Sequence, residues 1–118
     1  MAGSGYSKDF GGQSFISIVE MQITSGALQT FLDHLKVVAT ASAAEEGLLR
    51  CEFFIDQEDD HHITIIDIFR DKEAYEYHLT KEYLEVFRGA VAEIVEGEST
   101  QRIVKILGRE KNLIAVTS

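Results

Sequence analysis

The chain has 118 residues, enough for one domain with a single core. Acidic residues outnumber basic ones by 20 to 11, and the formal net charge is -9. A surface this negative repels phosphate backbones and anionic lipid headgroups, so the composition argues against a nucleic-acid or membrane partner. No apolar stretch is long enough to cross a bilayer and no signal-peptide pattern opens the chain, so we expect a cytoplasmic protein. The single cysteine, Cys51, has no partner for an internal disulfide, and we interpret it as a small core residue.

The first third of the chain predicts a strand followed by a helix. Residues 1–14 are rich in glycine and small polar residues, and we interpret them as a flexible lead-in that resembles a tag in part. Residues 15–23 alternate between an apolar and a mixed face, as a strand does. Thr24 and Ser25 offer N-cap oxygens to a helix that should end at Gly47, a residue suited to a left-handed C-cap. The apolar stripe of this helix contains Leu28, Phe31, Leu32, Leu35, Val38 and Ala39.

The rest of the chain predicts three more strands and one more helix. Residues 48–56 and 62–70 alternate in hydrophobicity and flank a short polar segment, a pattern typical of a hairpin. Asp71 is a good N-cap for a helix that carries an apolar stripe and ends near Gly97. Residues 100–107 form the last predicted strand.

The predicted order is β-α-β-β-α-β, the ferredoxin-like arrangement of an α+β protein, in a domain spanning residues 15–107. Two helices should cover one face of an antiparallel sheet. The strands also carry apolar residues on their other face, among them Ile16, Ile18 and Phe54, so we expect a second copy of the chain to cover it as a homodimer. Residues 108–118 form an extension that could hold a short extra or exchanged strand.

Several segments resemble the antibiotic-biosynthesis monooxygenase family at the same spacing. In the first half these are the strand at residues 15–23, the helix end Glu45-Glu46-Gly47 and the strand beginning Leu49-Arg50-Cys51-Glu52-Phe53. In the second half, Asp67-Ile68-Phe69-Arg70-Asp71 followed by Ala74 and His78-Leu79 is similar to the family's segment with an acidic residue, an aromatic residue and a later histidine.

The resemblance implies a dimeric α/β barrel with a pocket between sheet and helices in each subunit. Known members include cofactor-independent quinol-type monooxygenases, haem-degrading enzymes and an isomerase of a phosphorylated sugar, and membership alone does not choose among them. Phe69 stands where the haem-degrading members have tryptophan, and the chain contains no tryptophan. We therefore expect no haem and no other cofactor.

His78 is the strongest candidate for a catalytic residue. It lies four residues after Ala74, so both side chains project from one side of the predicted helix. An imidazole in an apolar pocket can accept a proton from a phenol near neutral pH. The alternative is a structural histidine hydrogen-bonded beneath the helix.

Other residues should line the pocket for a small aromatic or apolar metabolite. Asp67 could orient His78 or a water molecule, or pair with Arg50 or Arg102 on a neighbouring strand. Among the tyrosines of the second predicted helix, we expect Tyr83 to point at the ligand together with Phe87. The expected substrate-binding residues are Phe31, Leu35, Asp67, Phe69, Tyr83 and Phe87.

Three functions agree with this pattern. The leading one is a cofactor-independent monooxygenase of a quinol-like or polyketide-like phenol with His78 as base. The alternatives are an isomerase of a small metabolite that uses the same histidine, and a ligand-binding dimer without turnover. The acidic cluster at residues 56–62 suggests a metal site only weakly, because it lies in a hairpin turn, and we expect no metal.

Overall fold

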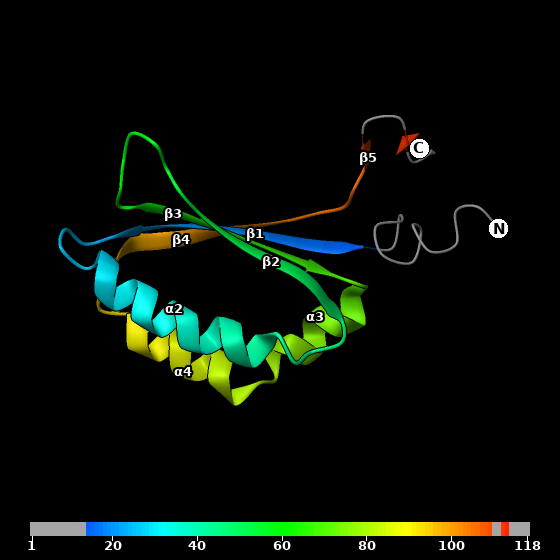
Figure 1. Cartoon of the computed structure of the whole chain (residues 1–118), viewed down its shortest axis with the longest axis horizontal. Coiled ribbons are helices and arrows are strands. Elements are labelled where there is room, and N and C mark those ends of the chain that lie inside the picture. Colours follow the sequence, from blue (N-terminus) through cyan, green and yellow to red (C-terminus); the bar gives the residue numbers. More distant parts are fainter. Residues whose placement is uncertain (1–13, 110–111, 114–118) are drawn as a thin grey trace.

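The computed structural model describes residues 14–109 and 112–113 and shows an α+β, ferredoxin-like domain (Figure 1). The main sheet has the order β2-β3-β1-β4, and every neighbouring pair of strands is antiparallel. Its strands are β1 (Phe15–Ile23), β2 (Leu48–Ile55), β3 (His62–Phe69) and β4 (Val95–Val104). The helices are α2 (Leu28–Ser42), α3 (Lys72–Leu79) and α4 (Glu82–Val91).

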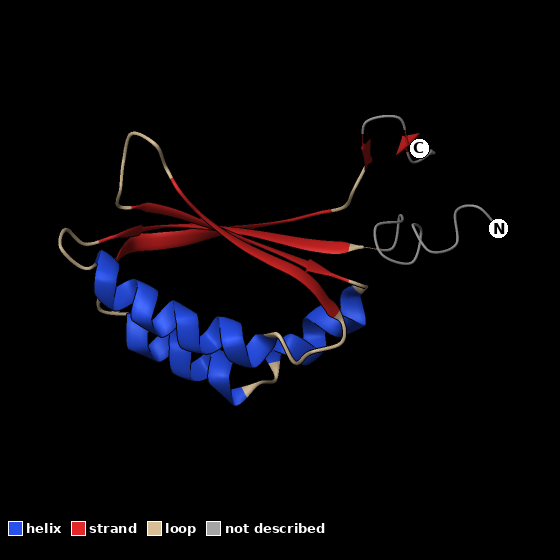
Figure 2. Cartoon of the chain, in the orientation of Figure 1, coloured by secondary structure: helices blue, strands red, loops and turns tan. Residues whose placement is uncertain are grey.

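All three helices lie on one face of the sheet and leave the other face uncovered (Figure 2). The core between these layers is built on Phe31, Ile23 and Ile63, which are at most 3% exposed. Period-two alternation puts Met21, Ile63 and Ile65 toward the helices, as predicted from the sequence. No helix within the described part of the chain is long and apolar enough to cross a membrane.

The ends of the first helix differ from the prediction. Its N-cap is Ala27 and has no side-chain hydrogen bond, so Thr24 and Ser25 do not cap it, and Gly26 takes a positive φ of 83° immediately before. The helix ends at Ser42. Gly47 is not a left-handed C-cap, since it is absent from the positive-φ glycines of the described residues. The close approach of Ala74 requires a glycine there instead.

The second predicted helix is in fact two helices. Asp71 caps α3 as expected, because its Oδ1 accepts a hydrogen bond of 2.8 Å from the backbone N–H of Ala74. The break comes at Thr80 and Lys81: the Thr80 hydroxyl donates to the carbonyl of Tyr77 at 2.6 Å, and Lys81 is extended with ψ 133°. The apolar spacing continues across this break, so periodicity alone does not reveal it.

The last strand starts earlier than predicted and contains a bulge. Glu20 pairs with Thr100, yet Gln22 pairs with Glu96 where a regular ladder would place Glu98. Gly97, with φ 67°, absorbs the bend. Beyond β4, β5 (Gly108–Arg109) and β6 (Asn112–Leu113) pair with each other. Residues 1–13 of the predicted lead-in at 1–14, and residues 110–111 and 114–118 of the predicted extension at 108–118, lie outside the described residues.

Candidate functional site

A cavity of about 460 Å³ lies between the sheet and the helices. This volume is within the range of pockets that hold small organic ligands. Side chains from β1, β2, β3, β4, α2, α3 and α4 line it, and most are apolar. The apolar wall includes Val19, Met21, Leu35, Val38, Phe87 and Val91, and the titratable lining residues are Cys51, Asp67, Tyr75, His78 and Arg88.

His78 lines this cavity and is held from behind by a buried carboxylate. Its Nδ1 lies 2.8 Å from Oε2 of Glu45, and the two side chains are only 8% and 3% exposed. The same Oε2 accepts a hydrogen bond of 2.5 Å from the Tyr83 hydroxyl. Burial and then this bond raise the pKa of Tyr83, so its phenol stays protonated and remains a donor.

The backbone around this pair explains how it is positioned. Glu45 lies in the turn after α2, and His78 lies in the last turn of α3. A Cβ atom built on Gly47 would lie 2.4 Å from Cβ of Ala74, so only glycine lets the turn pack this closely on α3. The Phe69 ring, which has no exposed surface, lies below, with its centroid 5.3 Å from that of His78.

Asp67 lines the cavity from β3, and its register partner on β2 is Cys51. The Cys51 thiol and the Asp67 carboxyl each shift the pKa of the other. Burial, above all, raises the pKa of Asp67, and the charge of Glu45 adds to this; burial and then Asp67 raise the pKa of Cys51. Neither Asp67 Oδ1 nor Glu45 Oε1 has a hydrogen-bond partner among the described residues, although both atoms are buried.

The cavity therefore contains some of the predicted site residues and not others. His78, Asp67, Leu35 and Phe87 line it. Three predicted substrate-binding residues do not: Phe31 and Phe69 are core residues with no exposed surface, and Tyr83 turns to Glu45.

Several residues of the site were not predicted for it, among them Tyr75 and Glu45. Tyr75 supplies the tyrosine of the lining, and its hydroxyl accepts a hydrogen bond of 3.2 Å from Gln101. Glu45 was overlooked, although it opens the Glu45-Glu46-Gly47 segment on which the family resemblance partly rests. The suggested pairing of Asp67 with Arg50 is absent, because Arg50 bonds Glu52 instead.

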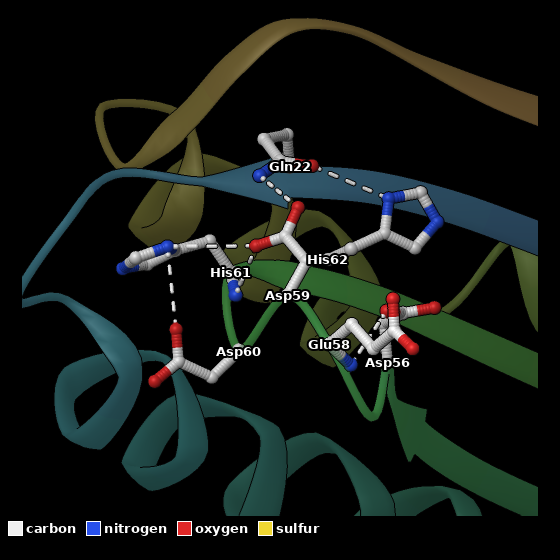
Figure 3. Close-up of polar contacts among 7 residues, drawn as sticks. All are labelled: Gln22, Asp56, Glu58, Asp59, Asp60, His61 and His62. Atoms are coloured by element: carbon white, nitrogen blue, oxygen red, sulfur yellow. Dashed lines mark hydrogen bonds and ion pairs between the residues drawn. The ribbon is translucent and has the colours of Figure 1, made fainter.

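The acidic hairpin turn between β2 and β3 is a separate cluster (Figure 3). Ligand atoms of Asp59, Asp60 and His61 lie within 4.8 Å of one another. Asp59 accepts hydrogen bonds from the Gln22 side chain at 3.1 Å and from the His61 backbone at 3.0 Å, which lower its pKa. The Asp60 side chain is 78% exposed. These bonds account for the turn as a local structure that ties β3 to β1.

Together, the β2-β3-β1-β4 sheet, the helices on one face and the histidine-bearing cavity between them define a ferredoxin-like domain with a small-molecule pocket. A model of the antibiotic biosynthesis monooxygenase family matches residues 14–90, which is more than half of the chain. The chain therefore belongs to this family. No curated protein sequence matches it significantly.

Solved structures show the same fold at low identity. A conserved protein from Methanosarcina mazei Go1 has a TM-score of 0.79 and 15% identity, over 85% of this chain and 97% of that one. A structure from Nitrosomonas europaea, described as a candidate antibiotic biosynthesis monooxygenase, has a TM-score of 0.78 and 16% identity, over 83% and 94%. A protein from Pseudomonas aeruginosa has a TM-score of 0.73 and 21% identity, over 81% and 96%. Such identities bear on the fold and leave the activity to be argued from the site.

Proposed function

We propose that the protein is a cofactor-independent monooxygenase that oxidises a quinol-like or polyketide-like phenol, with His78 as the base. The observation that carries this proposal is the buried Glu45–His78 pair at the wall of a mainly apolar cavity. Because Nδ1 is engaged by Glu45, Nε2 is the ring nitrogen left to accept a proton from a bound phenol. The Glu45 carboxylate then stabilises the imidazolium that forms.

The reaction needs little more than this base and a dry pocket. The phenolate gives an electron to O₂, and the resulting radical and superoxide join at a ring carbon that bears a hydrogen. The imidazolium of His78 returns its proton to the peroxide. Loss of water from this hydroperoxide, with the hydrogen of that carbon, leaves a carbonyl, so one oxygen atom enters the product, the other leaves as water, and the substrate supplies all the electrons. The apolar lining favours this sequence because it keeps bulk water from the anion and the hydroperoxide.

The working unit in this proposal is a homodimer. The sheet face away from the helices carries Ile16 and Ile18 on β1 directly opposite Ile68 and Ile66 on β3. None of these four side chains reaches full burial in the single chain. A contiguous apolar patch of this kind on a small domain is typical of a surface that pairs with a second copy.

The test is oxygen uptake by the purified protein with 1,5-dihydroxynaphthalene, in which the carbon para to each hydroxyl bears a hydrogen, followed by mass analysis of the product made under labelled O₂. We expect one labelled oxygen atom in the product. His78→Ala should lower the rate by about two to four orders of magnitude, the usual contribution of a positioned base. Uptake that is indifferent to this substitution would remove His78 from the role, and the same conversion without O₂ would favour an isomerase.

A further inference from the structure

Arg88 lies where the cavity opens to solvent. It is in the last turn of α4, lines the cavity and is exposed, so it belongs to the mouth of the cavity rather than its floor. At the floor, by contrast, the lining residues are buried, as His78 and Leu35 are.

The β4 bulge brings one free hydroxyl to the cavity wall. In a regular strand, neighbouring residues point to opposite faces. Thr100 pairs with Glu20 on β1, so its side chain shares the sheet face away from the helices, whereas Ser99, inside the bulge, and Gln101 line the cavity. Gln101 is already engaged, since its amide donates to Ser17 Oγ at 2.9 Å and to the Tyr75 hydroxyl. Within the described residues, the Ser99 hydroxyl makes no hydrogen bond.

Arg88 is the one lysine or arginine among the lining residues, in a chain with a net charge of -9. No acidic side chain in the described part of the chain lies within ion-pair distance of it, whereas Arg50 and Arg70 both have acidic partners. Arg88 also favours the C-terminal end of the α4 dipole, but a lysine would serve that purpose equally well. Neither an ion pair nor the helix dipole therefore explains an arginine at the edge of an apolar cavity.

We propose that the ligand is an aromatic carboxylate, whose carboxylate is bound at the mouth by Arg88 while its ring enters the apolar cavity. The planar guanidinium offers paired N–H donors that match a carboxylate. A single cation suits one negative charge better than the two of a phosphate monoester. This proposal deepens the proposed function and uses the same cavity, but it concerns recognition rather than turnover.

Equilibrium binding of naphthoate, naphthamide and naphthyl phosphate tests it. None of these probes carries a free phenolic hydroxyl to deprotonate and oxidise, so binding is measured without turnover, by calorimetry on the full chain. We expect naphthoate to bind at least about tenfold more tightly than naphthamide, because the two share a shape and differ in charge. Arg88→Met should remove this difference and leave naphthamide binding unchanged, and Arg88→Lys should retain part of it.

Lys36→Met is the matched control, because Lys36 is an exposed cation on α2 that does not line the cavity. It changes the net charge equally and should leave the naphthoate preference intact. The proposal would be overturned if the wild type bound naphthoate and naphthamide equally, bound naphthyl phosphate more tightly than naphthoate, or bound none of the probes. It would also be overturned if Arg88→Met weakened the binding of naphthoate and naphthamide equally, or if Lys36→Met reduced the naphthoate preference as much as Arg88→Met does. Oxygen uptake by the His78→Ala variant tests turnover, whereas these measurements test ligand binding, so either proposal can fail without the other.

Discussion

A Cβ atom on Gly47 would lie 2.4 Å from Cβ of Ala74, and this contact joins the two segments that hold the candidate site. Gly47 comes two residues after Glu45, and Ala74 comes one helical turn before His78. The close approach of the two backbones therefore sets the distance at which Glu45 Oε2 meets His78 Nδ1, which is 2.8 Å.

Replacing Gly47 by alanine should push the turn away from α3. We expect Gly47→Ala to lower the free energy of unfolding by about 1 to 3 kcal/mol, the usual cost of overpacking, and to reduce activity by moving Glu45. Adding Ala74→Gly removes the clashing methyl group, so the double variant should be more stable than Gly47→Ala alone. Urea denaturation of the three variants and the wild type measures this, and additive losses would show that the contact is not responsible.

Glu45→Gln separates the charge of Glu45 from its place in the packing. The amide oxygen can still accept hydrogen bonds from His78 and Tyr83, so the fold should survive with a small loss of stability. It cannot stabilise an imidazolium, so oxygen uptake should fall by roughly tenfold or more. Glu46→Gln, an exposed neighbour, is the control and should be silent. Full activity in Glu45→Gln would mean that His78 does not become charged in the reaction.

Asp67→Asn should make the protein more stable than the wild type at neutral pH. Burial raises the pKa of Asp67, so the folded state holds its proton more tightly than the unfolded chain, whose carboxyl titrates near about 4. As the pH rises from about 4 through the folded pKa, the wild type loses stability relative to the variant, by at most about 1.4 kcal/mol per pH unit. Below that window the difference should be constant.

Urea denaturation of both proteins across this pH range checks the prediction. The free energy of unfolding of Asp60→Asn, which changes an exposed carboxyl, should follow that of the wild type across the pH range. A wild-type curve that instead gains on Asp67→Asn with rising pH would show that the buried carboxyl is stabilised in its charged form.

The period-two pattern was enough to predict β1, β2 and β3 almost to the residue, because alternation is a local signal. The helices were harder. The break at Thr80 and Lys81 depends on a hydroxyl-to-carbonyl bond that interrupts no hydrophobic spacing. The stripe residues Leu84, Phe87 and Val91 nevertheless line the cavity. Tyr83 was expected at the ligand and is found on Glu45, while Tyr75 lines the cavity, because spacing does not show which of several tyrosines on adjacent turns faces the pocket.

Glu45 shows a limit of reading a single sequence. An acidic residue near the end of an amphipathic helix is normally solvated. Nothing in the spacing indicates that Glu45 as a whole residue, backbone included, is only 7% exposed. Its burial follows from the early end of α2 at Ser42 and from a contact with His78, 33 residues away. The β4 bulge is similar, because it depends on pairing with β1 and is marked in the sequence only by Gly97.

Cys51 should react slowly with thiol reagents even though it lines the cavity. The thiolate is the reactive form, and burial together with Asp67 raises the pKa of Cys51. Alkylation by iodoacetamide at mildly alkaline pH should therefore be much slower in the folded protein than in urea. It should be faster in Asp67→Asn and slower when naphthoate fills the cavity. Because the chain has one cysteine, the mass increase reports on this position alone.

Ile66→Glu should separate the proposed dimer. Ile66 is half-buried in the middle of the uncovered sheet face and lies directly opposite Ile18 in the ladder. A charge there would have to be buried against the second copy, at a cost well above that of leaving the face hydrated. Sedimentation velocity should show a dimer for the wild type and a monomer for the variant. Val86→Glu is the matched control, since Val86 is 61% exposed on α4 and does not line the cavity. A wild-type protein that sediments as a monomer at high concentration would contradict the dimer, because the isoleucines would then be stable in water.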